Sequence, residues 1–155
     1  MSEPESLAQL LPHADPMILL SGYEPSPSPD TVDAWIDIAP DSPFYVPESG
    51  GVPGCVALEY MAQSMALCIG SIRRVRGLGP KLGFVLGSRR LETAIPFFRN
   101  GERYRVHVHC TYHDESFGSF DCFIADAAGA VVATAQMTAF QPEGDITPET
   151  LEELT

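Results

Sequence analysis

The stretch CVALEYMAQSMALCIGSI, from Cys55 to Ile72, decides the fold. Its alanine, leucine and methionine content favours a helix, and Glu59 and Gln63 are among its few polar residues. A helix that is apolar nearly all round must be buried on most sides or lie in lipid. A carboxylate and an amide would be costly in lipid, and no second apolar span flanks the segment. The pattern therefore predicts a central, buried helix and no membrane span.

Short apolar runs bounded by turn residues predict strands on both sides of this helix. The two that precede it lie at 16–20 and 31–38, and the four that follow lie at 83–91, 104–112, 119–126 and 131–140. Short connections imply antiparallel pairing. We expect an α+β chain of one domain, residues 1–155, in which a curved antiparallel sheet wraps around the helix. Residues 1–12 are predicted to form a lead-in helix and residues 142–155 an acidic tail. A partner subunit is expected to cover the exposed sheet edge.

Charge is distributed very unevenly along the chain. The net charge of −12 and the pI of about 4.5 argue against nucleic acid as a partner. All nine basic residues lie between Arg73 and Arg105, where nine bases and two acids give +7. This basic segment is either a docking patch for an anionic partner or a solvated face that offsets the acidic remainder.

Cysteines and histidines give little support for a metal site. The four cysteines, at 55, 68, 110 and 122, have no CxxC spacing. His107, His109 and His113 are expected on one face of a strand, without a carboxylate or cysteine at matching spacing. No metal is predicted. The N-terminus lacks a basic region followed by a long apolar run, so we expect a cytoplasmic protein with reduced thiols.

Three segments carry a resemblance to a known family. Residues 53–63, PGCVALEYMAQ, resemble the PGxxxxEAMAQ segment of hotdog-fold 3-hydroxyacyl-carrier-protein dehydratases. Residues 11–20, LPHADPMILL, are similar to their N-terminal LPHRxPxLLxD segment, and residues 83–96 look like their strand that leads into an Arg and a Pro. Within that superfamily the chain looks most like the branch associated with aryl-polyene biosynthetic clusters.

The resemblance implies a hotdog dimer, with itself or with another hotdog subunit. Its substrate would be an acyl group carried on the phosphopantetheine of an acyl carrier protein, and the enzyme would need no cofactor of its own. The reaction expected is dehydration of a 3-hydroxyacyl thioester to the trans-2-enoyl thioester, in fatty-acid or aryl-polyene-type biosynthesis. Acidic carrier protein is expected to dock on basic residues that the fold would bring near one another: Arg73, Arg74, Arg76, Lys81, Arg89 and Arg90.

Dehydration needs a base for the C2 proton, an acid for the departing C3 hydroxyl, and donors for the thioester oxygen. Glu59 is the candidate acid, because the helix N-terminus favours its anion while burial favours its neutral form. Gln63, one turn later, is expected to orient it. The backbone N–H groups of Gly54, Cys55 and Val56 are the candidate donors at the helix N-terminus, after a Pro-Gly entry that lets a carbonyl approach. The expected substrate-binding residues are Gly54, Cys55, Val56, Gln63, Tyr45 and Gly83.

The chain departs from the family at one position. The ordinary dehydratases have a histidine fourteen residues before the glutamate, in a GHFPG segment, and Tyr45 stands there in this chain. The phenol of a tyrosine is a poor base at neutral pH. His13 in the matched N-terminal segment is then the candidate base, although it could instead cap the lead-in helix. A partner subunit could supply the base, or the chain could bind thioesters without catalysis.

Three functions remain open from the sequence. The leading one is the dehydratase, with Glu59 as acid and His13 as base. The second is an acyl thioesterase in which Glu59 activates water. The third is a non-catalytic subunit of a heteromeric hotdog dehydratase.

Overall fold

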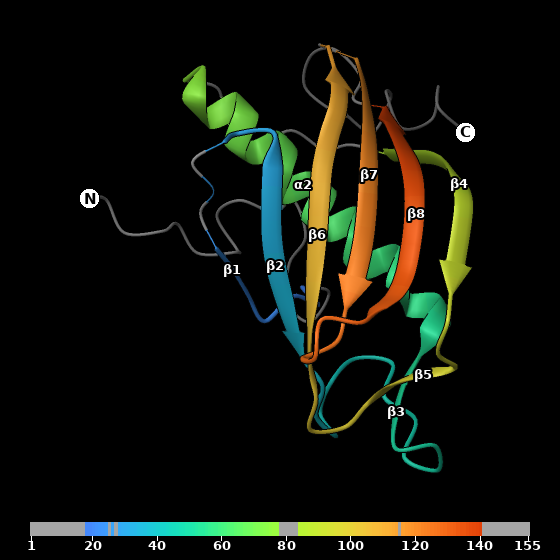
Figure 1. Cartoon of the computed structure of the whole chain (residues 1–155). Helices are drawn as coiled ribbons and strands as arrows, with labels where there is room; N and C mark the ends of the chain where they lie inside the picture. Colours follow the sequence, from blue (N-terminus) through green and yellow to red (C-terminus); the bar gives the residue numbers. More distant parts are fainter. Residues whose placement is uncertain (1–17, 25, 27, 78–83, 115, 141–155) are drawn as a thin grey trace, which may run out of the picture.

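The computed structural model describes residues 18–24, 26, 28–77, 84–114 and 116–140 (Figure 1). Several predictions fall on other residues and lie outside this part of the chain. They are the lead-in helix at 1–12, the acidic tail at 142–155, and the proposed roles of His13, Lys81 and Gly83.

One long helix and eight strands make up the described fold. The helix α2, Ala57–Val75, follows a short 3-10 turn, η1, at Gly54–Val56. The strands are β1 (Gly22–Glu24), β2 (Thr31–Asp37), β3 (Gly51–Pro53), β4 (Phe84–Thr93), β5 (Phe97–Arg99), β6 (Arg103–His113), β7 (Phe117–Ala125) and β8 (Val131–Phe140). The predicted helix and five of the six predicted strands are thus confirmed, with shifts of a few residues at their ends.

Six strands form one antiparallel sheet in the order β1-β2-β6-β7-β8-β4. A second, two-stranded sheet pairs β3 with β5 at the end of the molecule where α2 begins (Figure 1). The large sheet curves, and α2 runs diagonally across its concave face (Figure 1). This is the α+β arrangement of a hotdog fold, as the resemblance implies.

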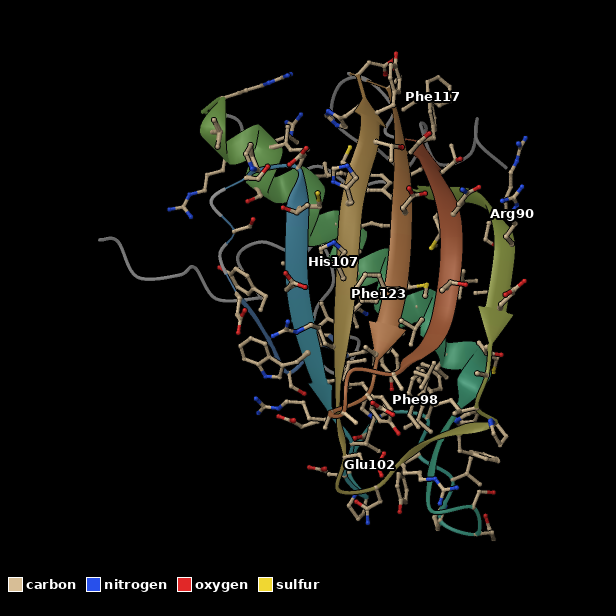
Figure 2. The ribbon with its side chains drawn as sticks, viewed as in Figure 1. Arg90, Phe98, Glu102, His107, Phe117 and Phe123 are labelled. Atoms are coloured by element: carbon tan, nitrogen blue, oxygen red, sulfur yellow. The ribbon has the colours of Figure 1, made fainter. Side chains whose placement is uncertain are left out.

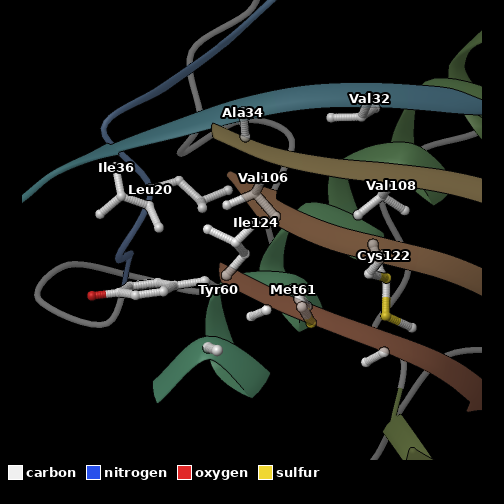
Figure 3. Packing of buried hydrophobic residues seen from close by; sticks show 14 of the residues in the cluster. Leu20, Val32, Ala34, Ile36, Tyr60, Met61, Val106, Val108, Cys122 and Ile124 are labelled. Atoms are coloured by element: carbon white, nitrogen blue, oxygen red, sulfur yellow. The ribbon is translucent and has the colours of Figure 1, made fainter. Parts of the chain in front are cut away.

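Alternation along the strands places the core between the sheet and α2. In β2 the buried residues are Val32, Ala34 and Ile36, whereas the residues between them are partly exposed. They join Tyr60 and Met61 of α2 in one cluster (Figure 3). The sheet therefore has an inner face against the helix and an outer face toward solvent.

Burial explains how the apolar helix is accommodated. By length and composition alone, Gly54–Val75 could also cross a membrane, but half of the apolar window is buried inside the protein. The Cys68 side chain, which is fully buried, accordingly has its pKa raised to about 12 by desolvation. The helix is the core element that its composition predicts.

Two sequence predictions are wrong in detail. Residues 18–20 do not form a strand; pairing with β2 begins at Ser21, whose N–H donates to the Trp35 carbonyl, and β1 covers Gly22–Glu24. His113 does not share a face with His107 and His109, because a bulge between Cys110 and Tyr112 shifts the alternation of β6. The short strands β3 and β5 were not predicted, since three residues carry no readable period.

A close backbone approach fixes the start of the helix. The N–H of Gly54 donates to the Pro96 carbonyl at 2.8 Å, and a Cβ added at Gly54 would lie 2.5 Å from the Ile95 carbonyl oxygen. Both neighbouring atoms belong to the backbone, so neither can move aside cheaply. Glycine is therefore required here for packing.

We expect Gly54→Ala to lower the free energy of unfolding of the isolated chain by about 1–3 kcal/mol, because the added methyl group must push two backbone segments apart. Urea denaturation followed by circular dichroism measures this change. Gly87→Ala is the matched control, since a Cβ at Gly87 meets nothing within 4 Å. Equal stability of the two variants would show that the approach of residues 95–96 does not constrain Gly54.

Candidate functional site

The candidate acid is held by the side chain one turn further along α2. The amide nitrogen Nε2 of Gln63 donates to Oε1 of Glu59 at 3.2 Å. Gln63 is fully buried, whereas Glu59 is half-buried in the first turn of the helix. The predicted pairing of these two residues is present, and it fixes the carboxylate on the helix surface while leaving it reachable.

A third group determines the orientation of the Gln63 amide. The backbone N–H of Leu19 donates to Oε1 of Gln63 at 2.8 Å, and this bond is buried. Because Oε1 accepts from Leu19, the NH2 group of Gln63 must point toward Glu59. The order Leu19 N–H, Gln63 amide, Glu59 carboxylate is thus determined by donor and acceptor chemistry.

Leu19 also places the start of the described residues beside the site. It lies six residues after His13, and six residues reach at most about 20 Å when fully extended. His13 itself lies outside the described residues. The sequence does not predict this contact, because the apolar run at 16–20 has the pattern of a strand, whose N–H groups bond to a neighbouring strand. A buried glutamine in an apolar helix was the available signal that some backbone group must meet it.

The helix N-terminus retains only part of its predicted donor set. The N–H of Gly54 is already bonded to Pro96, so Gly54 cannot also serve a substrate oxygen as predicted. Cys55, which is exposed, and Val56, which is half-buried, remain as candidates from η1. Gly54 shapes the site by letting the segment at 95–96 pack against the helix start.

Tyr45, at the family's histidine position, lies in the ordered loop between β2 and β3. Its side chain is half-buried and packs on the core, and its N–H donates to the Ser42 carbonyl at 3.1 Å. Phe44 before it has a φ of 68° and is 53% exposed. A bulky side chain rarely adopts this left-handed conformation, so the turn geometry is imposed by the surrounding loop.

The predicted basic patch is divided in the structure. Arg73, Arg74 and Arg76 lie at the C-terminal end of α2, which extends past β2 (Figure 1). Arg89 and Arg90 lie on β4, at the opposite edge of the sheet (Figure 2). The expectation that these two groups lie near one another in one chain is wrong, because the helix crosses the whole width of the sheet.

Two further arginines of the basic segment, Arg103 and Arg105, lie in a third place. Arg103 makes a two-pronged bond to Asp37, at 2.6 and 3.0 Å, on the outer face of the sheet. Arg105 lies on the same face near Glu24, at 3.9 Å. Within the part of the chain that the structure describes, clustering along the sequence therefore does not produce one continuous basic surface.

Grooves on the outer face are separate from the Glu59 site. One of them, of about 730 Å³, lies over β2, β6 and β7, and two others, of about 550 and 240 Å³, lie over β7 and β8. Glu59 lines none of these three grooves.

We expect Gln63→Met to lower the free energy of unfolding by about 1–3 kcal/mol, because the buried N–H of Leu19 loses its acceptor. Urea denaturation gives the value. Ser64→Ala is the matched control: the Ser64 hydroxyl is also buried, but it donates to the Tyr60 carbonyl within the helix, so its removal leaves no buried donor without an acceptor. If both variants lose the same stability, the Leu19 bond has no special role.

Comparisons with known proteins give a family and a similar solved structure. The chain matches the model of the ApeP-like family, described as ApeP dehydratase, over residues 5–152. It is similar to a chain of the dehydratase heterocomplex ApeI:P from Xenorhabdus doucetiae, with 29% identity, 98% of each chain covered and a TM-score of 0.87. No curated protein matches.

More distant structures share the fold alone. A hypothetical thioesterase with coenzyme A from Streptococcus pneumoniae TIGR4 has 17% identity and a TM-score of 0.61, with 80% of this chain and 88% of that chain covered. The PaaI protein of the E. coli phenylacetic acid degradation operon has 11% identity and a TM-score of 0.59, with 77% and 81% covered. Because the family model spans nearly the whole sequence, the chain belongs to the ApeP-like dehydratase family.

Proposed function

We propose that this chain is a subunit of a dehydratase that converts a 3-hydroxyacyl thioester on an acyl carrier protein to the trans-2-enoyl thioester. The observation that carries the proposal is the Glu59 carboxylate, held by Gln63 in the first turn of an otherwise apolar helix. Membership of a dehydratase family supports the reaction class. Aryl-polyene or fatty-acid chains are the proposed acyl groups.

The proposed step removes water across one carbon–carbon bond. A base takes the C2 proton, the C2–C3 double bond forms from that electron pair, and the C3–O bond breaks. Protonated Glu59 gives its proton to the departing hydroxyl, which leaves as water. The N–H groups of Cys55 and Val56 are the proposed donors to the thioester oxygen as it gains charge.

The base that takes the C2 proton has to come from a segment other than α2. His13 is our first candidate, since Leu19 anchors the N-terminal segment to Gln63. Tyr45, at the position of the family's histidine, packs on the core. A partner subunit is the alternative source of the base.

A second hotdog subunit is the proposed partner in either case. The strand β4 is an edge of the sheet, and its residues 87–93 are exposed in the single chain. An exposed edge strand is a template for pairing with another chain. The ApeI:P complex shows that a similar protein assembles as a heterocomplex, and we propose the same for this chain, in the cytoplasm.

We expect Glu59→Gln to abolish enoyl formation without unfolding the protein, because the amide has the shape but not the acidic proton. His13→Ala should lower turnover by about 100-fold or more, the scale of a positioned base. The assay follows enoyl absorbance and free thiol in parallel, with 3-hydroxyacyl and plain acyl thioesters of one pantetheine carrier.

The two readouts separate the alternatives. Free thiol from both substrates, without enoyl absorbance, would replace the dehydratase by a thioesterase. Activity of a folded Glu59→Gln variant near that of the unmodified chain would remove Glu59 from the mechanism. If His13→Ala changes only thermal stability, the base comes from elsewhere, and enoyl formation that appears only with a second hotdog subunit would locate it there.

Carrier docking is proposed at Arg89 and Arg90 on β4. Both are exposed in the single chain and line grooves on the face of the sheet, so a partner that pairs with the backbone edge of β4 leaves these side chains available. Arg90 has a φ of 53° within a bulge between Arg89 and Glu92. The bulge redirects these side chains at a cost in backbone strain. Arg73 is fourteen residues from Glu59 along α2, or about 21 Å, and lies at the far edge of the sheet.

We expect the double reversal Arg89→Glu/Arg90→Glu to raise KM for carrier-bound substrate and to leave small pantetheine thioesters unaffected, because only the carrier is acidic. Added salt should bring the unmodified chain toward the variant, since exposed charges are screened within about 8 Å. Arg74→Glu/Arg76→Glu tests the other basic group. A larger effect from that pair would move the docking site to the helix end, and equal effects on both substrate types would refute docking by charge.

A further inference from the structure

The groove of about 730 Å³ over β2, β6 and β7 contains a histidine–aspartate pair on the side of the sheet away from α2. Nδ1 of His107 on β6 lies 2.9 Å from Oδ1 of Asp33 on β2. The imidazole also stacks on the Phe123 ring of β7, with centroids 4.9 Å apart and planes 24° from parallel (Figure 2). One ring nitrogen and one ring face of His107 are thus occupied, which fixes the orientation of the imidazole.

The other side chains of the groove supply an apolar floor and one available cation. Trp35 and Phe123 line the groove with their rings. Arg103, which lies over Trp35 at 5.3 Å, is already bound to Asp37 by two short bonds. Arg105 is more than half exposed, and its contact with Glu24 is long, at 3.9 Å.

The carboxylates that face the groove are largely engaged. Asp33 is bound to His107, and Asp126 accepts the backbone N–H groups of Ala128 and Ala130 in the β7–β8 turn. Glu24, on β1, holds Arg105 only loosely. To bind the Arg105 guanidinium, an anion therefore has to displace only the weakly held Glu24 carboxylate.

The geometry points to a binding site for a small amphipathic carboxylate in this outer-face groove. Arg105 and His107 are two residues apart on β6, so they share a face with Cα atoms about 7 Å apart. The ligand's carboxylate would accept from the Arg105 guanidinium, whose fork matches a carboxylate, and from the ring nitrogen of His107 that does not face Asp33. Its chain or ring would lie on Trp35 and Phe123.

The same geometry predicts how binding depends on pH. With Nδ1 held by Asp33, the remaining nitrogen of His107 donates only when the ring carries a second proton. Histidine is the residue type that gains this proton between about pH 8 and pH 5. The other charged groups around it are Asp33 on β2, Glu24 on β1, Asp126 in the turn, and Arg103 and Arg105 on β6. Among the residue types that line the groove, histidine is the one whose charge ordinarily changes in this range.

The fluorescence of Trp35 reports on binding in the groove, since Trp35 is the single tryptophan of the sequence. We expect octanoate, followed by Trp35 emission, to give a saturable change with an affinity about tenfold higher at about pH 6 than at about pH 8, the scale of one hydrogen bond to a charged group. Octan-1-ol, with the same chain and no charge, should give no comparable change.

Variants of residues that line the groove make the test specific. Arg105→Gln should weaken octanoate binding about tenfold, His107→Gln should remove the pH dependence, and Glu24→Gln should strengthen binding by freeing Arg105. Arg99→Gln, at an exposed arginine of β5 that does not line the groove, is the control and should change nothing.

Three results would overturn the proposal. They are no saturable change, an equal response to octan-1-ol, and an octanoate affinity that is unaffected by Arg105→Gln. An affinity that is the same at both pH values would exclude His107 as a donor and so refute the two-donor site.

Discussion

The amide of Gln63 is the contact that connects the fold to the site. It is buried where α2 meets the N-terminal segment, and it uses both of its ends, accepting from Leu19 and donating to Glu59. A buried amide with one end unmatched would cost stability. The segment before β1, the helix and the carboxylate are therefore positioned by one side chain, and the candidate acid cannot be moved without disturbing the core.

The rest of the architecture serves to present this arrangement at one end of the molecule. The large sheet covers one side of α2. Next to the small β3–β5 sheet, the bond between Gly54, which follows β3, and Pro96, which precedes β5, holds the start of the helix. The edge strand β4 is left uncovered. A chain built this way has a fixed acid and an unpaired edge, which agrees with the proposal that a second subunit completes the enzyme.

The central helix, five of the six predicted strands and the Glu59–Gln63 pair could be predicted because each is a local pattern. Apolar composition identifies the helix, alternation identifies β2, and an i, i+4 spacing brings the two side chains together. The Leu19 contact spans 44 residues, so no periodicity contains it. The bulge in β6 reverses the face of His113, and a single extra residue leaves no mark in the hydrophobic pattern. The prediction that the basic segment forms one surface was wrong for a related reason. The path of the chain places residues that are close in sequence at opposite edges of the sheet.

Oxygen exchange with labelled water tests the central claim most directly. The protein, with its partner subunit if it needs one, is incubated with a 3-hydroxyacyl thioester in water enriched in oxygen-18, and the recovered thioester is analysed by mass spectrometry. Reversible dehydration assisted by Glu59 predicts that the label enters the C3 hydroxyl while the thioester stays intact. Label found only in a released carboxylic acid, or an unlabelled thioester recovered after prolonged incubation, would contradict the account.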